Sequence, residues 1–131
     1  MPATILVVED EGDIAILLRY NLEAEGFRVV TAETGDEAQH AIQEKLPDLI
    51  LLDWMMPLMD GREVVERLDQ EQPDSGIEII VISGQPAPSV LPARVRSWLT
   101  KPLTVDELVS EIGRDRSEHK AAAVTTLAEE H

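Results

Sequence analysis

Four short apolar runs in this chain each lead into residues with reactive side chains. These residues are Glu9 and Asp10 after residues 4–8, Asp53 at the end of residues 48–53, Ser83 after residues 77–82, and Lys101 close behind residues 97–99. If the runs are parallel strands, their carboxyl ends lie at one edge of a sheet, and the five side chains meet there. Neighbouring carboxylates disfavour each other's ionisation, so a cation should accompany them. Mg²⁺, or another divalent cation such as Mn²⁺, prefers such oxygen ligands.

The same side chains suit the transfer of a phosphoryl group. A carboxylate beside a metal ion and a lysine can accept that group, because both cations neutralise charge on its equatorial oxygens. The hydroxyl of Ser83 can then hydrogen-bond to a phosphoryl oxygen. Taken singly, Asp53 and Glu9–Asp10 are read more simply as caps, Lys101 as a surface lysine and Ser83 as part of a turn. Their occurrence together at four strand ends favours the functional interpretation.

An alternation of strand and helix patterns is expected to position these residues. Apolar and β-branched residues predict strands at residues 4–8, 27–31, 48–53, 77–82 and 97–99. Helical spacing predicts a first helix with Ile14, Leu17, Leu18 and Leu22 on one face, ended by Gly26. Further helices are predicted at residues 35–45, 61–70 and 105–112. This order predicts an α/β fold, with a parallel sheet and helices on both of its faces.

Two segments depart from the alternation. Residues 85–96 hold three prolines where another helix is due, and proline costs about 3 kcal/mol inside a helix. We therefore expect this fourth helix to be short, late or replaced by a loop. Residues 114–131 are polar with scattered apolar positions, and are expected to form a C-terminal extension or linker after a domain at residues 1–113.

Composition excludes several classes of protein. The chain has 131 residues and no cysteine, so disulfides and thiolate metal sites are impossible. The net charge of −15 disfavours direct binding of nucleic acid by this segment. The N-terminus has no basic region before its apolar run, and no apolar run is long enough to span a membrane. We expect a cytoplasmic protein with a protein partner and no membrane contact.

Four motifs give the chain a resemblance to the receiver domain of two-component response regulators. They are VVEDE at residues 7–11, LILLDWMMPLMDG at 49–61, ISG at 82–84 and LTKP at 99–102, within a resemblance that covers residues 3–113. The resemblance implies a flavodoxin-like, doubly wound sandwich with five parallel strands in the order 2-1-3-4-5. It also implies a phosphoacceptor that signals to a downstream partner and is not an enzyme in the ordinary sense.

The resemblance implies a role for each matching position. Asp53 is the phosphoacceptor, supplied by a sensor histidine kinase or phosphotransfer protein, with Lys101 and the switch hydroxyl of Ser83 beside it. Asp10, Asp53 and the backbone carbonyl of Met55 bind Mg²⁺, and Glu9 acts through a metal-bound water. The remaining implied positions are structural: Pro57, Gly61, and Pro102 after a cis peptide bond. Trp98 matches the position of a switch aromatic, and an anchor in the core or an interface is its alternative.

Some positions depart from the family pattern. The interval from Ser83 to Lys101 is a few residues short, and Arg94-Val95-Arg96-Ser97 replaces the usual Gly- and Ala-rich lead into the fifth strand. These changes leave the phosphorylation site intact, but alter the face by which many family members dimerise. The shortened fourth-helix region also supports an alternative, a pseudo-receiver that binds partners without using phosphate.

Two other classes of α/β protein fit the residues poorly. A metal-dependent phosphohydrolase or nuclease would want a second Asp at position 55, which is methionine. A dinucleotide-binding domain would want a glycine-rich loop after the first strand.

Overall fold

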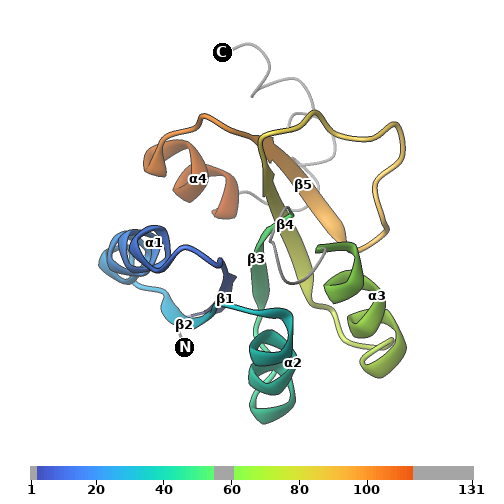
Figure 1. The fold of residues 1–131 in the computed structure, drawn as a ribbon. Helices are drawn as coiled ribbons and strands as arrows, with labels where there is room; N and C mark the ends of the chain where they lie inside the picture. Colours follow the sequence, from blue (N-terminus) through green and yellow to red (C-terminus); the bar gives the residue numbers. More distant parts are fainter. Residues whose placement is uncertain (1–2, 55–60, 114–131) are drawn as a thin grey trace.

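A parallel five-stranded sheet forms the centre of the molecule (Figure 1). The computed structural model describes residues 3–54 and 61–113. The strands are β1 (Thr4–Val8), β2 (Arg28–Ala32), β3 (Leu49–Asp53), β4 (Glu78–Ser83) and β5 (Val95–Thr100), in the order β2-β1-β3-β4-β5. This is the flavodoxin-like order, so the predicted fold class is confirmed. The order reverses between β1 and β3, where ligands bind in open α/β sheets.

Helices cover both faces of the sheet and divide the core into two clusters. The helices are α1 (Gly12–Ala24), α2 (Gly35–Glu44), α3 (Gly61–Glu71) and α4 (Val105–Ile112). The apolar side chains of α1 and α4 pack on one face, and those of α2 and α3 pack on the other (Figure 1). Every residue of β1 and β3 is buried. The apolar run before Asp53 is therefore a central strand with both faces covered.

Local sequence signals define where the helices begin and end. Gly26, with a φ of 97°, ends α1: its N–H donates to Glu23 O, and the N–H of Phe27 donates to Leu22 O. This is a Schellman motif, which a glycine allows because it tolerates positive φ. Helix α4 begins with a capping box between Thr104 and Glu107. Within the described residues, no helix is long and apolar enough to cross a membrane.

The segment between β4 and β5 has no helix. Residues 84–94 are all described and contain only turns and irregular backbone, so the expected fourth helix is replaced by a loop. The helix at 105–112, the last predicted one, is α4. Strand β5 is longer than the predicted 97–99, because Val95 pairs with Ile79 ahead of a register shift. Charged Arg96 hides this part of the strand from a reading based on apolar runs.

One predicted core position is on the surface. Ala15, Leu18 and Leu22 form the buried face of α1, whereas the side chain of Leu17 is 54% exposed. Leu17 lies at the rim of the groove between α1 and α4, so the buried stripe is narrower than the predicted one. Residues 114–131, predicted to form an extension or linker, lie outside the described residues, as do Met55 and Pro57.

Candidate functional site at the carboxyl edge of the sheet

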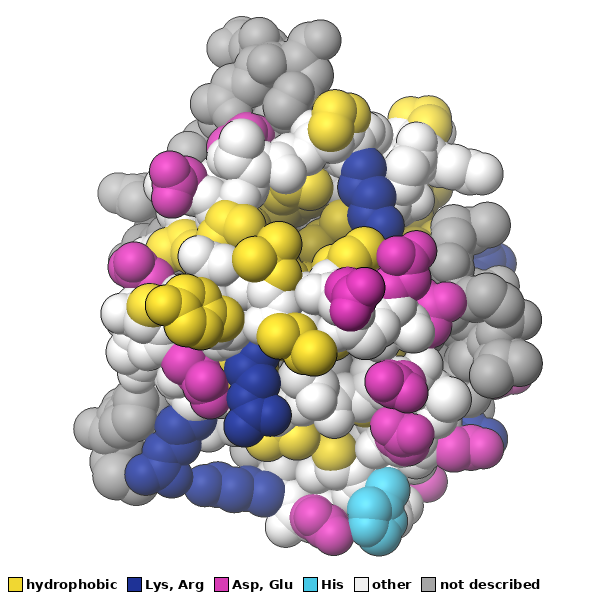
Figure 2. Space-filling model, turned by 60° about the vertical axis from the view of Figure 1, so that its left-hand side comes forward, with side chains coloured by type: hydrophobic (Ala, Val, Ile, Leu, Met, Phe, Trp, Pro, Cys, Tyr) yellow, Lys and Arg dark blue, Asp and Glu magenta, His cyan; other side chains and the backbone are white. Residues whose placement is uncertain are grey.

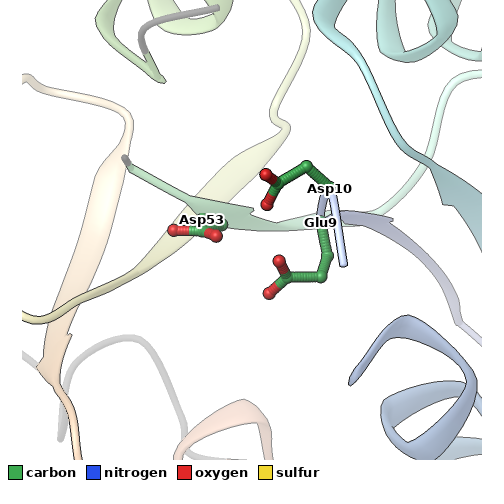
Figure 3. A group of neighbouring side chains, drawn as sticks. All are labelled: Glu9, Asp10 and Asp53. Carbon is green, nitrogen blue, oxygen red and sulfur yellow. The ribbon is translucent and has the colours of Figure 1, made fainter. Parts of the chain in front are cut away.

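Three carboxylates meet where β1 and β3 end. Glu9 and Asp10 follow β1, and Asp53 is the last residue of the adjacent strand β3. One oxygen from each carboxylate lies within 4.8 Å of the others. Figure 3 shows the three side chains pointing into a common space beyond the strand ends. Parallel pairing of β1 with β3 therefore brings together acids that are far apart in the sequence.

Burial makes this cluster electrostatically unfavourable without a cation. The exposed fractions of Glu9 and Asp53 are 5% and 8%. Burial raises the pKa of Glu9 from 4.5 to about 8; the N–H of Glu11 opposes this shift, and the neighbouring Asp53 and Asp10 reinforce it. The raised pKa favours the protonated form of Glu9 at neutral pH in the metal-free protein. A divalent cation would reverse this preference by favouring the ionised form.

The hydroxyl and the lysine predicted for the site lie at the ends of the next two strands, Ser83 as the last residue of β4 and Lys101 directly after β5. Ser83 ends β4 with an exposed fraction of 1%, and its Oγ accepts a hydrogen bond of 3.1 Å from Gln85 N–H. The backbone N–H of Lys101 donates to Ser83 O at 2.8 Å, which ties the end of β5 to β4. The Lys101 side chain is exposed and lines the same cavity of about 350 Å³ as Glu9. The Lys101–Pro102 peptide bond is cis.

A pair of tryptophans lies beside the site on the α3 face. Trp54 directly follows Asp53, and its ring centroid is 5.0 Å from that of Trp98 in β5. Trp98 Nε1 donates a hydrogen bond of 2.9 Å to the carbonyl of Gln85. Gly61 packs so closely on Trp54 that an added Cβ would lie 2.9 Å from the indole Cε3. The sequence places Trp98 in β5, but its contacts with Trp54 and Gln85 were not predicted.

These contacts had only a weak signal in the sequence. Two of the few aromatic residues are tryptophans near predicted strand ends, which is suggestive of proximity but does not identify a pair. Gly61 carries its own signal, since a glycine that opens a helix often permits a close approach.

Comparison with known proteins defines the family. Residues 5–113 match the family model of the response regulator receiver domain, and the chain belongs to that family. It is 40% identical to the phosphate regulon transcriptional regulatory protein PhoB of Rhizobium meliloti, over 94% of this chain and 56% of PhoB. It is 37% identical to the alkaline phosphatase synthesis transcriptional regulatory protein PhoP of Bacillus subtilis, over 86% of this chain and 48% of PhoP. The chain thus spans about half the length of these curated relatives.

Solved structures give the same fold. A CheY-like receiver domain protein from Methanospirillum hungatei matches with a TM-score of 0.80 and 26% identity, covering 92% of this chain and 98% of that one. The response regulator TrrA of Thermotoga maritima, solved in complex with Mg²⁺ and BeF, matches with a TM-score of 0.74 and 30% identity. That alignment covers 86% of this chain and 96% of TrrA.

The residues of the cluster fit a hard divalent cation. All three ligating groups are carboxylates, and their oxygens are close enough to share one ion. The burial of Glu9 and Asp53 would be costly if both were ionised without a compensating charge. The chemistry of the donor set therefore agrees with the magnesium site that the sequence predicts. The Met55 carbonyl, the remaining predicted ligand, lies outside the described residues.

Proposed function

We propose that Asp53 accepts a phosphoryl group from a phosphohistidine on a sensor histidine kinase or a phosphotransfer protein. The observation that carries this proposal is the meeting of Glu9, Asp10 and Asp53 at the switch-point edge, with Ser83 at the end of β4 and Lys101 directly after β5. A carboxylate oxygen of Asp53 attacks phosphorus as the P–N bond breaks. The leaving imidazole keeps the electron pair of that bond and takes up a proton, so the products are an acyl phosphate and a neutral histidine.

Each neighbouring residue has a distinct part in this proposal. Asp10, Asp53 and the Met55 carbonyl would hold Mg²⁺, or another divalent cation such as Mn²⁺, with Glu9 acting through a metal-bound water. The cation would neutralise charge on the phosphoryl oxygens. Lys101 supplies a second positive charge from the cavity that it shares with Glu9. Because Ser83 Oγ accepts from Gln85 N–H, its own hydrogen remains available for a phosphoryl oxygen.

Phosphorylation of Asp53 is proposed to change the conformation of the domain. It adds negative charge and acceptor oxygens at the end of β3. A movement of Ser83 toward them would disturb Gln85, whose carbonyl is bonded to Trp98. In the proposal Trp98 is therefore the switch aromatic. Residues 1–113 form the receiver domain, and residues 114–131 form a C-terminal extension or linker. The downstream partner is a protein surface or an effector domain.

The face formed by α1 and α4 is suited to the phosphoryl donor. Figure 2 shows hydrophobic side chains gathered on this side of the molecule, with both acidic and basic side chains around them. Ile16, Leu17 and Tyr20 of α1 have exposed fractions of 68%, 54% and 74%. Leu17 also lines the cavity that contains Glu9 and Lys101. A donor seated on α1 would thus reach Asp53 across the groove. The proposal places this phosphoryl transfer in the cytoplasm, where histidine kinases have access to ATP.

Intact mass spectrometry tests the phosphoacceptor. The chain is incubated with acetyl phosphate and Mg²⁺, and the wild type is expected to gain one phosphoryl group that hydroxylamine removes. Asp53→Asn should gain none, and chelation of the metal should abolish labelling of the wild type. An unchanged mass with metal confirmed bound, or equal labelling of Asp53→Asn, would count against the proposal.

The missing helix between β4 and β5 favours one alternative, a pseudo-receiver that binds its partner without phosphate. In that case Asp53→Asn would leave partner binding unchanged under conditions in which the wild type is phosphorylated. Under the favoured proposal, the same substitution removes the difference in partner binding between treated and untreated protein.

A further inference from the structure

Two arginines at the start of the edge strand β5 extend to opposite faces of the sheet. Arg94, just before the strand, extends to the α3 side, where it contacts the end of α3 and the loop that follows. Its side-chain nitrogens donate to Asp69 Oδ1 at 2.5 Å, Gln72 O at 2.5 Å, Pro73 O at 3.2 Å, Ser75 O and Oγ at 3.0 and 3.1 Å, and Ile77 O at 3.1 Å. Four of these six acceptors are backbone carbonyls that follow α3, beginning with Gln72 O, and Asp69 lies in the last turn of the helix. Arg94 therefore ties the start of β5 to the end of α3 and to the loop that follows it.

Arg96 makes the corresponding contacts on the α4 side. Its Nη2 donates to Glu111 O at 2.9 Å, and its Nη1 lies 3.5 Å from Ile112 O. Nη1 is also 3.9 Å from a carboxylate oxygen of Glu78 in β4. The side chains of Arg94 and Arg96 are 11% and 7% exposed. Both arginines are thus held within the fold and are not part of a solvated charged surface.

A β-bulge in β5 directs the side chain of Arg96 toward α4. Ile79 pairs with Val95, but the next residue, Ile80, pairs with Ser97, so Arg96 is the extra residue of the bulge. As a result Arg96 and Ser97 both contact α4, the latter through a buried hydrogen bond of 2.6 Å from Ser97 Oγ to Glu111 Oε2. In a regular strand, successive side chains would point to opposite faces.

The guanidinium groups of Arg94 and Arg96 lie near the C-terminal ends of α3 and α4, where positive charge is favourable. The last carbonyls of a helix lack partners inside the helix, and cations near that end are favourable. Neither α3 nor α4 has a basic residue in its last turn. Within the described residues, Arg94 and Arg96 add positive charge and further N–H donors near both helix ends from the β5 side.

We propose that the side chains of Arg94 and Arg96, here called the clamp, hold the edge strand β5 against the rest of the fold. The clamp takes over the support that a helix between β4 and β5 would give. A helix between β4 and β5 would cover the edge strand on one face. Here residues 84–90 are exposed, and Gln85 contacts β5 through the hydrogen bond from Trp98 Nε1 to its carbonyl. The clamp fixes the start of β5 to both helix layers. The pairing of Ser83 with Thr100 and the bond from Lys101 N–H to Ser83 O then set the other end of the strand.

The clamp makes Arg94 and Arg96 positioning residues for Lys101. This last link rests on the proposed function, because it assumes that Lys101 serves a phosphoryl group on Asp53. The clamp itself does not depend on that function. It requires only that loss of either guanidinium loosens β5 and one particular helix end.

Hydrogen–deuterium exchange of the whole chain tests the clamp directly. Arg94→Gln is expected to speed exchange at least tenfold in the last turn of α3 and in β5, and Arg96→Gln in the last turn of α4 and in β5. Arg94→Lys and Arg96→Lys keep the charge but lose the planar fork, and should not restore protection. Arg19→Gln, which removes an exposed arginine paired with Glu23, should change these rates less than twofold.

A second arm asks whether the loop supports the strand. Replacement of residues 86–90 by glycine and serine, at the same length, should leave exchange in β5 within twofold of the wild type. The clamp is overturned if this replacement loosens β5 as much as Arg94→Gln does. It is also overturned if the lysine variants restore protection, or if the arginine variants speed exchange equally in every element.

Phosphorylation separates the clamp from the proposed function. If the wild type is labelled by acetyl phosphate, the arginine variants should be labelled at least fivefold more slowly at a temperature where they remain folded. Equal rates would overturn the link to Lys101. A wild type that takes no label would instead refute the proposed function, and the exchange measurements would still decide the clamp.

Discussion

Trp54 and Trp98 pack against each other with ring centroids 5.0 Å apart and ring planes tilted by 56°. Trp54 follows the proposed phosphoacceptor along the chain, while Trp98 is bonded through its indole N–H to the residue two positions after Ser83. The pair thus joins the ends of β3, β4 and β5 on the α3 side. An indole in this setting reports on events at Asp53 and on the start of the loop at 84–94.

Changes in tryptophan fluorescence should therefore follow phosphorylation. In Trp98→Phe the remaining Trp54 should respond to Mg²⁺ and to beryllofluoride, a stand-in for the phosphoryl group, because it neighbours Asp53. In Trp54→Phe the remaining Trp98 should respond to beryllofluoride but only weakly to Mg²⁺ alone, since it senses movement of Gln85. A Trp98 signal that is identical with and without beryllofluoride would remove the case for a switch and leave Trp98 as an anchor.

Gly61 is predicted to be essential for the packing of Trp54. Gly61→Ala would place a Cβ 2.9 Å from Trp54 Cε3 and 3.0 Å from its Cα, so backbone or indole must move. We expect a loss of about 1–3 kcal/mol in the free energy of unfolding, measured by urea denaturation. Gly76→Ala is the matched control, because nothing lies within 4 Å of its added Cβ. That variant should be neutral or slightly stabilising, and equal losses in both variants would contradict the steric explanation.

The fold could be predicted from the sequence because the central strands carry continuous apolar runs. The buried residues of β1 and β3 are the ones that the runs indicated, and the acids at their ends then followed from parallel pairing. The predicted length of β5 was too short because Arg96 interrupts its apolar pattern. Arg96 lies at a bulge and donates a hydrogen bond to a carbonyl of α4, a contact that the sequence of β5 alone does not contain. The exposure of Leu17 likewise depends on how α4 packs beside α1, which helical spacing within α1 does not contain.

A substitution on the apolar face of α1 should slow phosphoryl transfer from a protein donor. It should not change labelling by a small phosphodonor. Leu17→Asp places a charge on the rim of the groove, so transfer from the kinase that phosphorylates the wild type should slow more than tenfold. Labelling by acetyl phosphate should remain within twofold, because that donor does not need the face. Leu46→Asp is the control: Leu46 is 47% exposed and precedes β3, at the opposite end of that strand from Asp53. Equal effects of both substitutions on kinase transfer would exclude α1 as the docking surface.

Glu9 should make the stability of the metal-free protein fall with rising pH. Its pKa is raised from 4.5 to about 8 in the folded state, first through burial. Between these values the folded protein holds more protons at Glu9 than the unfolded chain does, so unfolding becomes easier as pH rises. This contribution is fully present below pH 4.5 and is lost as pH rises through about 8. Thermal unfolding between pH 6 and 8 in chelator should show the decline, and Glu9→Gln should flatten it.

The same proton couples metal affinity to pH. A Mg²⁺ ion beside Glu9 favours the ionised form and so releases the proton. Affinity for Mg²⁺ should therefore increase with pH, by up to about tenfold per unit, until the pKa of Glu9 at about 8 is passed. Calorimetry in buffers of different ionisation enthalpy measures that proton release directly. Glu9→Gln should bind Mg²⁺ more weakly and with less pH dependence, because Asp10 and Asp53 keep their carboxylates while the titrating group is gone. Proton release that is unchanged in Glu9→Gln would assign the coupling to another group and contradict the role of Glu9.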